Sequence, residues 1–316
     1  MEEEESGADP VAADEGQGPA EQDQTPHGRL TRVPRIVALD DPADPRLRPY
    51  RDVRERDLIG REGIFLAEGK VVIEKLVAAR GHRLESLLVA AHRVGSLAGM
   101  LSTLDAETPV FAASQQVIDA VAGFPLHRGL IAVGRRTDRP DAAALLASLP
   151  DRATVIVLAG IANHDNIGGI FRNAAAFGAN AVLLDHHCCD PLYRKAIRVS
   201  VGAALLVPFA RMASGADVPA LLGDHGFRLI ALTPAGSRQL AALAPASRDA
   251  ILLGAEGPGL PQAVLDRAIG VRIPMAPGFD SLNVATTSGI VLHHLMSKTP
   301  AVEAAADPAD DRVRAG

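Results

Sequence analysis

The second half of the chain alternates short apolar stretches with helical ones in a regular order. The apolar stretches are "TVIVLAGI", "NAVLLD", "FRLIALTP", "DAILLGAE" and "VRIPM". Continuous apolar runs are typical of parallel strands, which need crossover helices and are buried on both faces of the sheet. The alternation therefore predicts an α/β fold with a mostly parallel sheet over residues 153–298, closed by a helix from about residue 282.

A smaller α/β unit precedes this region. "GIFLAEG", "LESLLVAA", "TPVFAAS" and "RGLIAVGRR" have the composition of strands, and "KVVIEKLVAA", "GSLAGMLSTL" and "QQVIDAVAGF" that of helices. These elements predict a first domain over residues 34–135, of a size common for one domain. The charged, proline-bearing stretch at residues 136–152 predicts a linker.

The charge of the chain is unevenly distributed. The net charge is −6, of which residues 1–28 contribute −9 and residues 299–316 contribute −2, so residues 29–298 carry +5. Acidic segments of this kind predict a disordered amino-terminal tail and a flexible carboxyl-terminal one. The basic body permits contact with phosphates. The acidic start lacks the pattern of a signal peptide and no apolar run is long enough for a membrane span, so we expect a cytoplasmic protein.

Two neighbouring cysteines in "DHHCCDP" raise the question of a zinc site. Its ligands would be His186, His187, Cys188 and Cys189. Consecutive side chains diverge, whereas zinc motifs space their ligands by two to four residues. We therefore expect no metal site and interpret the stretch as a loop after a strand.

Three loops that follow strands carry polar residues, and the first is "NHDNIGGIFRN". Asn166, Gly168 and Gly169 open a helix that carries Arg172. Free amides and the positive end of a helix dipole attract anions, and a guanidinium matches phosphate. The simpler interpretation is that the glycines allow close packing and that Arg172 is a solvated surface residue. The spacing fits neither a Rossmann fingerprint nor a P-loop.

The second loop, "ILLGAEGPGLP", places Glu256 among glycines directly after a strand. Its carboxylate could orient a hydroxyl or a cationic donor, or it could simply complement the dipole of a helix that begins near Pro261. The third loop, "IPMAPGFDSLNV", has more breakers than a turn requires. Ser281 could cap the closing helix, but capping does not explain Asn283, so we expect this loop to hold a ligand.

Together these loops resemble the SpoU/TrmH family of ribose 2′-O-methyltransferases, within the SPOUT superfamily. "NIGGIFRNAAAFGA", "LLGAEGPGL" and "IPMAPGFDSLNVATTSGI" are similar to the three motifs of that family, in the same order. The resemblance covers about residues 153–297. Residues 50–134, with "FLAEG" and "HRGLIAV", more loosely resemble the L30e-like RNA-binding domain of the family.

The resemblance implies a carboxyl-terminal trefoil knot, which is rare among proteins. It also implies S-adenosylmethionine as cofactor, an RNA partner, and a homodimer whose site takes residues from both subunits. The implied catalytic residues are Asn166, Arg172, Glu256, Ser281 and Asn283. The implied cofactor-binding residues are Leu253, Gly254, Gly257, Ile273, Met275 and Leu282.

In the implied reaction Arg172 lies near the ribose hydroxyl. Because arginine is a poor base, we expect it to stabilise the developing oxyanion, while Asn166 orients Arg172 or the ribose. The first domain would bind RNA through its phosphates. The candidate contacts there are Arg51, Arg54, Arg56, Lys70 and Arg128, although each of them taken singly is better explained as an ordinary solvated charge.

One departure from the family pattern is Pro277, which stands where the family commonly has glycine. Other functions remain open, among them an RNA-binding protein that has lost its chemistry and an enzyme that methylates a base. The intact residue set favours the ribose methyltransferase, and the large first domain favours ribosomal over transfer RNA. A nucleotide-dependent oxidoreductase is disfavoured because its glycine fingerprint is missing.

Overall fold

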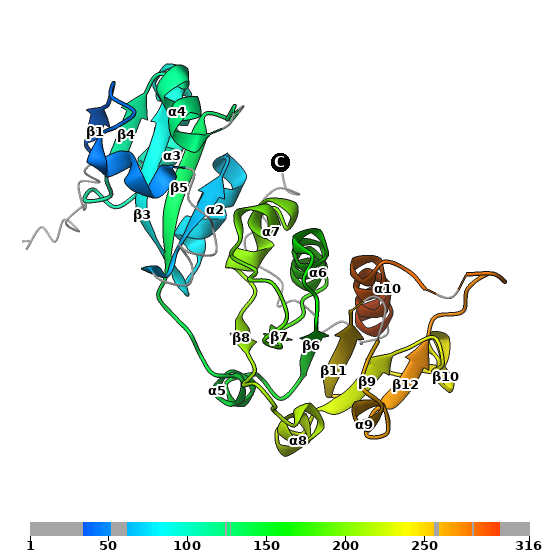
Figure 1. The fold of residues 1–316 in the computed structure, drawn as a ribbon. Coiled ribbons are helices and arrows are strands. Elements are labelled where there is room, and N and C mark those ends of the chain that lie inside the picture. The colour runs from blue at the N-terminus through cyan, green and yellow to red at the C-terminus, as the bar shows by residue number, and fades with distance from the viewer. Residues whose placement is uncertain are drawn as a thin grey trace, which may run out of the picture. The chain divides into compact units, whose positions relative to one another are not determined.

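The computed structural model describes residues 34–51, 62–123, 125–126, 128–255, 259–279 and 281–297. Its helices and strands form two sheets with their covering helices (Figure 1). Several of the residues predicted above lie outside the described ranges. These are the two tails and Arg54, Arg56, Glu256 and Gly257.

The first sheet is mixed and contains five strands of the described region. They are β1 (Ile36–Ala38), β2 (Ile64–Glu68), β3 (His82–Ala90), β4 (Val110–Ala113) and β5 (Leu130–Arg136), in the order β1-β4-β3-β5-β2. Strands β1 and β3 run parallel to β4, whereas β2 and β3 run antiparallel to β5. The four strands predicted here are present, and the short edge strand β1 was not predicted.

The helices of this part are α2 (Lys70–Ala78), α3 (Ala98–Leu101) and α4 (Gln115–Ala122), with 3₁₀ turns at Pro45–Tyr50, Ala91–Arg93 and Gly95–Leu97. Local signals set the limits of α4. The Ser114 hydroxyl accepts a hydrogen bond from the Val117 amide at 3.3 Å, and Gly123 ends the helix with a φ of 76°. The predicted helix in "GSLAGMLSTL" is reduced to a 3₁₀ turn and the single α-turn of α3.

The second sheet contains seven described strands, all paired in parallel. They are β6 (Ala153–Ala159), β7 (Ala181–Leu184), β8 (Phe209–Arg211), β9 (Arg228–Leu232), β10 (Arg238–Gln239), β11 (Arg248–Gly254) and β12 (Ile269–Arg272). Their order is β10-β12-β9-β11-β6-β7-β8. The predicted α/β class and parallel sheet are confirmed.

Helices cover both faces of this sheet. In Figure 1, α6 (His164–Ala176), α7 (Arg194–Val199) and α10 (Val284–Ser297) lie on one face, and α5 (Ala142–Ala147), α8 (Val218–Asp224) and α9 (Gln262–Leu265) lie on the other. Alternate residues of each strand point to opposite faces. On β6, Ile156 and Leu158 belong to the apolar cluster beneath α6 and α10, whereas Val155 and Val157 belong to the cluster beneath α5 and α8.

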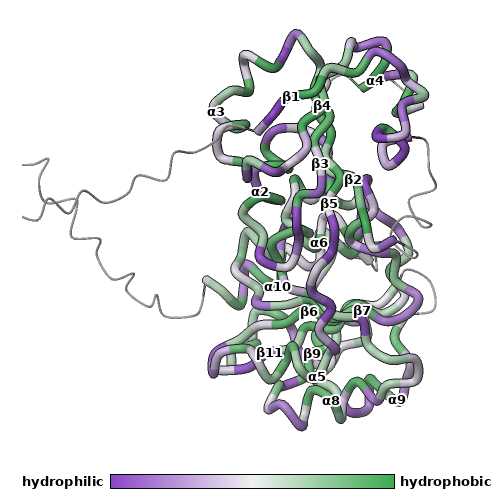
Figure 2. Tube along the Cα trace, turned by 90° about the vertical axis from the view of Figure 1, so that its left-hand side faces the viewer, coloured by the Kyte–Doolittle hydropathy of each residue, from purple (hydrophilic) through white to green (hydrophobic). Residues whose placement is uncertain are grey.

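Hydrophobic residues therefore run continuously through the inner strands, as the colouring of β6 and β11 in Figure 2 shows. The structure differs from the sequence prediction mainly at element ends. Residues 136–152, expected to be only a linker, contain α5, whose Leu145 and Leu146 are buried. The last helix begins at Val284 and the last strand ends at Arg272. No helix in the described residues is long and apolar enough to cross a membrane.

Candidate functional site

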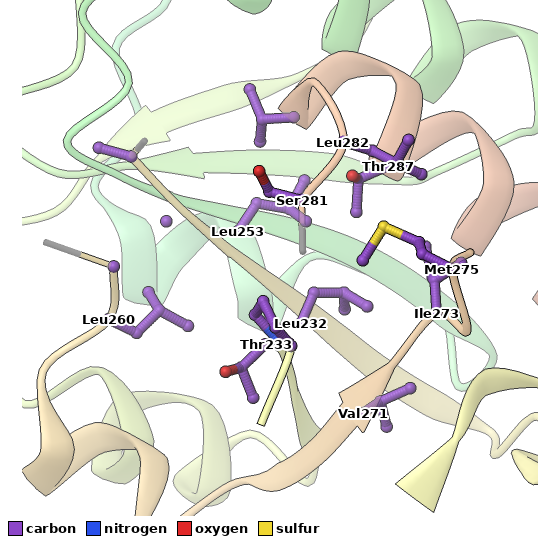
Figure 3. Close-up of a pocket in the computed structure, with 15 residues that line it drawn as sticks. Leu232, Thr233, Leu253, Leu260, Val271, Ile273, Met275, Ser281, Leu282 and Thr287 are labelled. Carbon is purple, nitrogen blue, oxygen red and sulfur yellow. The ribbon is translucent and has the colours of Figure 1, made fainter. Parts of the chain in front are cut away.

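A cavity of about 470 Å³ opens where the carboxyl ends of β9, β11 and β12 meet the start of α10. These three strands are neighbours in the sheet, so the loops that follow them converge at one edge, where α/β sheets bind ligands. Figure 3 shows the side chains around the cavity. It is lined by Leu232, Thr233, Pro234, Leu253, Gly254, Ala255, Gly259, Leu260, Val271, Ile273, Met275, Ser281, Leu282, Val284 and Thr287.

The cavity gathers most of the residues expected to bind a cofactor. Leu253, Gly254, Ile273, Met275 and Leu282 all line it. The sixth expected residue lies outside the described ranges. The predicted catalytic Ser281 lines the same cavity. Sequence segments that are widely separated along the chain are thus brought to one place.

The walls of the cavity are mainly apolar, with a few hydroxyl groups. Leu260 lies on the opposite side from Ile273 and Met275 (Figure 3). Hydroxyls come from Thr233, Ser281 and Thr287. Apolar walls with a few placed polar groups are typical of small-molecule sites.

Gly254 gives the cavity a backbone wall at the end of β11. A Cβ at this position would lie 2.9 Å from Cδ2 of Leu260 and 3.4 Å from the carbonyl carbon of Gly259. A larger residue would require the Leu260 side chain to shift, so the two segments approach each other closely at this glycine.

Asn283, and not Ser281, caps the helix that borders the cavity. Its Oδ1 accepts hydrogen bonds from the amides of Ala285 at 2.9 Å and Thr286 at 3.3 Å, and its carbonyl accepts from Thr287 at 2.9 Å. The expectation that capping leaves Asn283 unexplained was wrong. A side-chain oxygen two or three residues ahead of free amides is the usual capping arrangement.

Asn283 also joins α10 to α6. Its Nδ2 donates to Oδ1 of Asn166 at 2.8 Å. Asn166 lies in the first turn of α6, which is capped by Asn163 through a 2.8 Å hydrogen bond to the amide of Asp165. Two of the predicted catalytic residues thus contact each other directly.

Arg172 lies on another side of α6. An α-helix turns by about 100° per residue, so Arg172 and Asn166 face different directions. The Oδ1 of Asn166 bonds to Asn283, and the expectation that Asn166 orients Arg172 or the ribose stays a prediction. Arg172 is exposed and forms no hydrogen bond or ion pair with the residues that the structure describes. Its guanidinium is accessible to a ligand.

The predicted RNA contacts that can be placed lie outside the strands of the first sheet: Arg51 follows the 3₁₀ turn Pro45–Tyr50, Lys70 begins α2 and Arg128 lies shortly before β5. Arg51 donates to the carbonyls of Pro42 at 3.1 Å and Asp44 at 3.2 Å. Arg128 lies over the turn before α2, since a Cβ on Gly69 would be 2.9 Å from its Nη1. Lys70, the next residue, forms an exposed ion pair with Glu74 at 3.7 Å. Lys70 and Arg128 are therefore close together, whereas Arg51 is held by its own loop.

The neighbouring cysteines serve the packing. The Cys188 Sγ accepts from the amide of Ile161 at 3.3 Å, and burial raises the pKa of this thiol to about 12. Burial likewise raises the pKa of Cys189 to about 12. Within the described ranges no group of three or more His, Cys, Asp or Glu residues could hold a metal ion.

Sequence reasoning missed one wall of the cavity. Leu232 ends β9, Thr233 and Pro234 follow it, and Thr287 lies one turn into α10. The stretch "FRLIALTP" ends a buried strand with a hydroxyl and a proline, which is a sequence signal for a binding loop. The signal does not connect this loop with the other two, since only the strand order shows that β9 lies between β11 and β12.

The family described as SpoU rRNA Methylase matches residues 153–293. An uncharacterised tRNA/rRNA methyltransferase of Mycobacterium bovis is 42% identical over 262 residues, which are 80% of this chain and 89% of the relative. The chain belongs to the SpoU/TrmH family of RNA methyltransferases. A 23S rRNA (guanosine-2′-O-)-methyltransferase of Escherichia coli is 30% identical over 184 residues, or 57% of this chain and 75% of the relative.

Solved structures share the fold over most of the chain. A crystal structure of an RNA 2′-O ribose methyltransferase matches with a TM-score of 0.67 and 27% identity, covering 83% of this chain and 99% of that one. An AdoMet-bound rRNA methyltransferase from Sinorhizobium meliloti matches with a TM-score of 0.70 and 24% identity, covering 82% and 97%. These similarities extend over both sheets of this SpoU/TrmH family member.

Proposed function

We propose that this protein transfers a methyl group from S-adenosylmethionine to a ribose 2′-hydroxyl in structured RNA. The single observation that carries the proposal is the cavity at the sheet edge, which is lined by Ser281 and by the start of α10, where Asn283 bonds to Asn166. Family membership supports RNA methylation. The names of the Escherichia coli relative and of one solved neighbour support the 2′-hydroxyl as acceptor.

The residues that line the cavity fit the cofactor. Its volume of about 470 Å³ falls within the roughly 300–1,000 Å³ of small-molecule sites. The leucines and Ile273 supply apolar walls for an adenine ring, and Thr233, Ser281 and Thr287 supply hydroxyls for ribose and amino-acid groups. When bound, S-adenosylmethionine supplies an electrophilic methyl group on its sulfonium sulfur.

The polar residues would orient the acceptor and stabilise its charge. Arg172 presents a fork of donors, so it would stabilise the negative charge that develops on the ribose hydroxyl oxygen during the transfer. Asn166 and Asn283 hold the starts of α6 and α10 in a fixed relation, which positions the acceptor beside the cavity. Glu256 would complete this polar wall.

A homodimer would explain where Arg172 acts. Arg172 is not among the residues that line the cavity of its own chain, and on α6 it lies about 100° around the helix from Asn173, which contacts α10. We therefore propose that Arg172 of one protomer serves the cavity of its partner.

A trefoil knot in the last part of the chain and an L30e-like fold for the first sheet belong to the same proposal. The part of the chain that contains the first sheet would contact RNA. The residues proposed for these contacts are Lys70, Arg128, Arg51 and Arg54.

Ribosomal RNA is the favoured substrate class, with transfer RNA as the second candidate. The Escherichia coli relative is named for 23S rRNA, whereas the Mycobacterium bovis relative is named for tRNA or rRNA. The additional first sheet offers a surface for a large structured RNA, which proteins recognise mainly by shape and backbone.

The test is methyl transfer from labelled S-adenosylmethionine into separated ribosomal and transfer RNA, followed by digestion to nucleosides. We expect a labelled 2′-O-methylnucleoside from the wild type. Arg172→Ala should lower the rate by about 10²–10³-fold, as removal of an oxyanion donor does. Arg172→Lys keeps the charge but loses the fork and should be intermediate. Label on a base, or full activity of Arg172→Ala, would refute the proposed mechanism.

A further inference from the structure

Helices α6 and α10 are joined by polar contacts as well as by packing. At their starts, Asn283 donates to Asn166 at 2.8 Å. One turn further, Gly169 lies directly against α10, since a Cβ there would be 2.7 Å from the Cβ of Ala285. Asn173 makes the next contact, one turn beyond Gly169 on the same side of α6.

Asn173 holds α10 through two hydrogen bonds. Its Nδ2 donates to the carbonyl of Ala285 at 2.7 Å and to Oγ of Ser288 at 2.9 Å. Ser288 is fully buried and its hydroxyl donates to the same carbonyl at 2.7 Å. Gly289 makes room for the amide, because a Cβ there would be 3.1 Å from the Asn173 Nδ2. The amide therefore fixes the register of the two helices.

This contact lies between the two functional parts of the site. Arg172 immediately precedes Asn173 on α6. On α10, Val284 and Thr287 line the cavity and flank Ala285, whose carbonyl receives the Asn173 hydrogen bond. Desolvating even a partly buried amide costs free energy, and apolar packing alone could hold two helices together. The amide adds a defined geometry between the cavity and the backbone of Arg172.

We infer that Asn173 is a positioning residue for methyl transfer, which transmits the state of the cofactor cavity to Arg172. The inference rests on the proposed function. A ligand that contacts Val284 and Thr287 orders the first turn of α10, and Asn173 passes this order to α6. A displacement of about 1 Å at a catalytic group can lower a rate by roughly 100-fold, so the coupling matters for the chemistry.

The first test is hydrogen exchange of the peptides from α6 and α10, with and without S-adenosylmethionine. In the wild type we expect the cofactor to slow exchange in both helices. In Asn173→Ala the slowing should persist at the start of α10 and be lost in α6, with cofactor affinity unchanged. Ser86→Ala is the matched control. It removes a partly buried hydrogen bond of 2.6 Å to Tyr50 in the first sheet and should behave as the wild type.

Kinetics give the second readout. Asn173→Ala should lower kcat by at least about tenfold and leave the KM for S-adenosylmethionine unchanged. If the substitution only destabilised the protein, its kcat would fall in proportion to its Tm, as we expect for Ser86→Ala. Should Asn173→Ala not fold, Gly289→Ala provides the alternative. Its added methyl group would lie 3.1 Å from the Asn173 Nδ2, so the amide has to shift by a few tenths of an ångström, and we expect the coupling to weaken in the same direction.

Three outcomes would overturn the inference. In the first, the cofactor still slows exchange in α6 of Asn173→Ala. In the second, the bound cofactor slows exchange in the wild type only in α10. In the third, the kcat of Asn173→Ala falls only as far as that of Ser86→Ala. A wild type that does not bind S-adenosylmethionine would overturn the proposed function itself. The exchange readout holds whichever protomer's cavity Arg172 serves.

Discussion

Asn283 performs two tasks with the two ends of one amide. Its oxygen caps α10, and its nitrogen donates to Asn166 on α6. A serine could perform the first task but is too short for the second. For capping alone, serine, aspartate and asparagine are about equally suitable. The use of both ends explains why an asparagine suits this position.

Substitutions at Asn283 should separate these tasks. Asn283→Ala removes the cap and should lower the free energy of unfolding by about 1 kcal/mol, the usual value of a cap. Asn283→Ser retains a capping oxygen and should keep most of this stability, yet lose methyl transfer as far as the alanine variant does. Thermal unfolding and the transfer assay measure the two effects. Equal activity of the serine variant and the wild type would show that the contact with Asn166 is dispensable.

Helix α6 is packed on two sides through glycine. Gly169 faces Ala285 on α10, as described above, and Gly168 faces α7. A Cβ on Gly168 would lie 2.7 Å from the Cβ of Val199 and 2.9 Å from the carbonyl oxygen of Ala196. Because one of these atoms belongs to the backbone, the neighbour cannot move aside cheaply. The glycines thus allow the helix that carries Arg172 to lie deep between its neighbours.

Gly168→Ala should therefore destabilise the protein despite the higher helix propensity of alanine. We expect a loss of about 1–3 kcal/mol, as in other overpacked cores. Gly223→Ala in α8 is the matched control, because nothing lies within 4 Å of its added Cβ. It should stabilise the protein by up to about 1 kcal/mol. Denaturant unfolding of both variants measures the change in the free energy of unfolding. A Gly168→Ala variant that is more stable than the wild type would contradict the close packing of Gly168 against α7.

At the scale of the whole molecule, charge divides the chain. Residues 1–28 hold nine acidic residues and no lysine or arginine, whereas residues 29–298 carry a net charge of +5. An acidic segment attached to a basic body competes with the phosphates of RNA for that body. The effect is long-range and does not depend on a particular contact, so it belongs to the molecule as a whole.

Removal of residues 1–28 changes the net charge from −6 to +3 and should tighten RNA binding at low salt. Fluorescence polarisation with a labelled structured RNA measures this. The gain should vanish at about 1 M salt, where the screening length is only about 3 Å. A full-length variant with its nine acids changed to Gln or Asn should reproduce the gain. An unchanged affinity at low salt in both variants would exclude the proposed competition.

Most elements of the fold could be predicted from the sequence because their signals are local. Buried runs such as "TVIVLAGI" indicate parallel strands, and cap residues such as Ser114 and Gly123 mark helix ends. The predictions that failed concern short or weak elements. Helix α5 was missed because Asp141 and the prolines of its segment suggested a linker, and the helix predicted in "GSLAGMLSTL" is only a 3₁₀ turn followed by α3.

The sequence by itself determined which residue types the three predicted loops bring to the site, since the glycines and polar residues of each loop are adjacent in the chain. Only the tertiary structure decided how they meet. The strand order β12-β9-β11 adds Thr233 to the cavity, and the packing of α6 on α10 pairs Asn166 with Asn283 and Asn173 with Ser288. The two contacts between α6 and α10 join residues more than a hundred positions apart, and no local propensity or periodicity carries information over that separation.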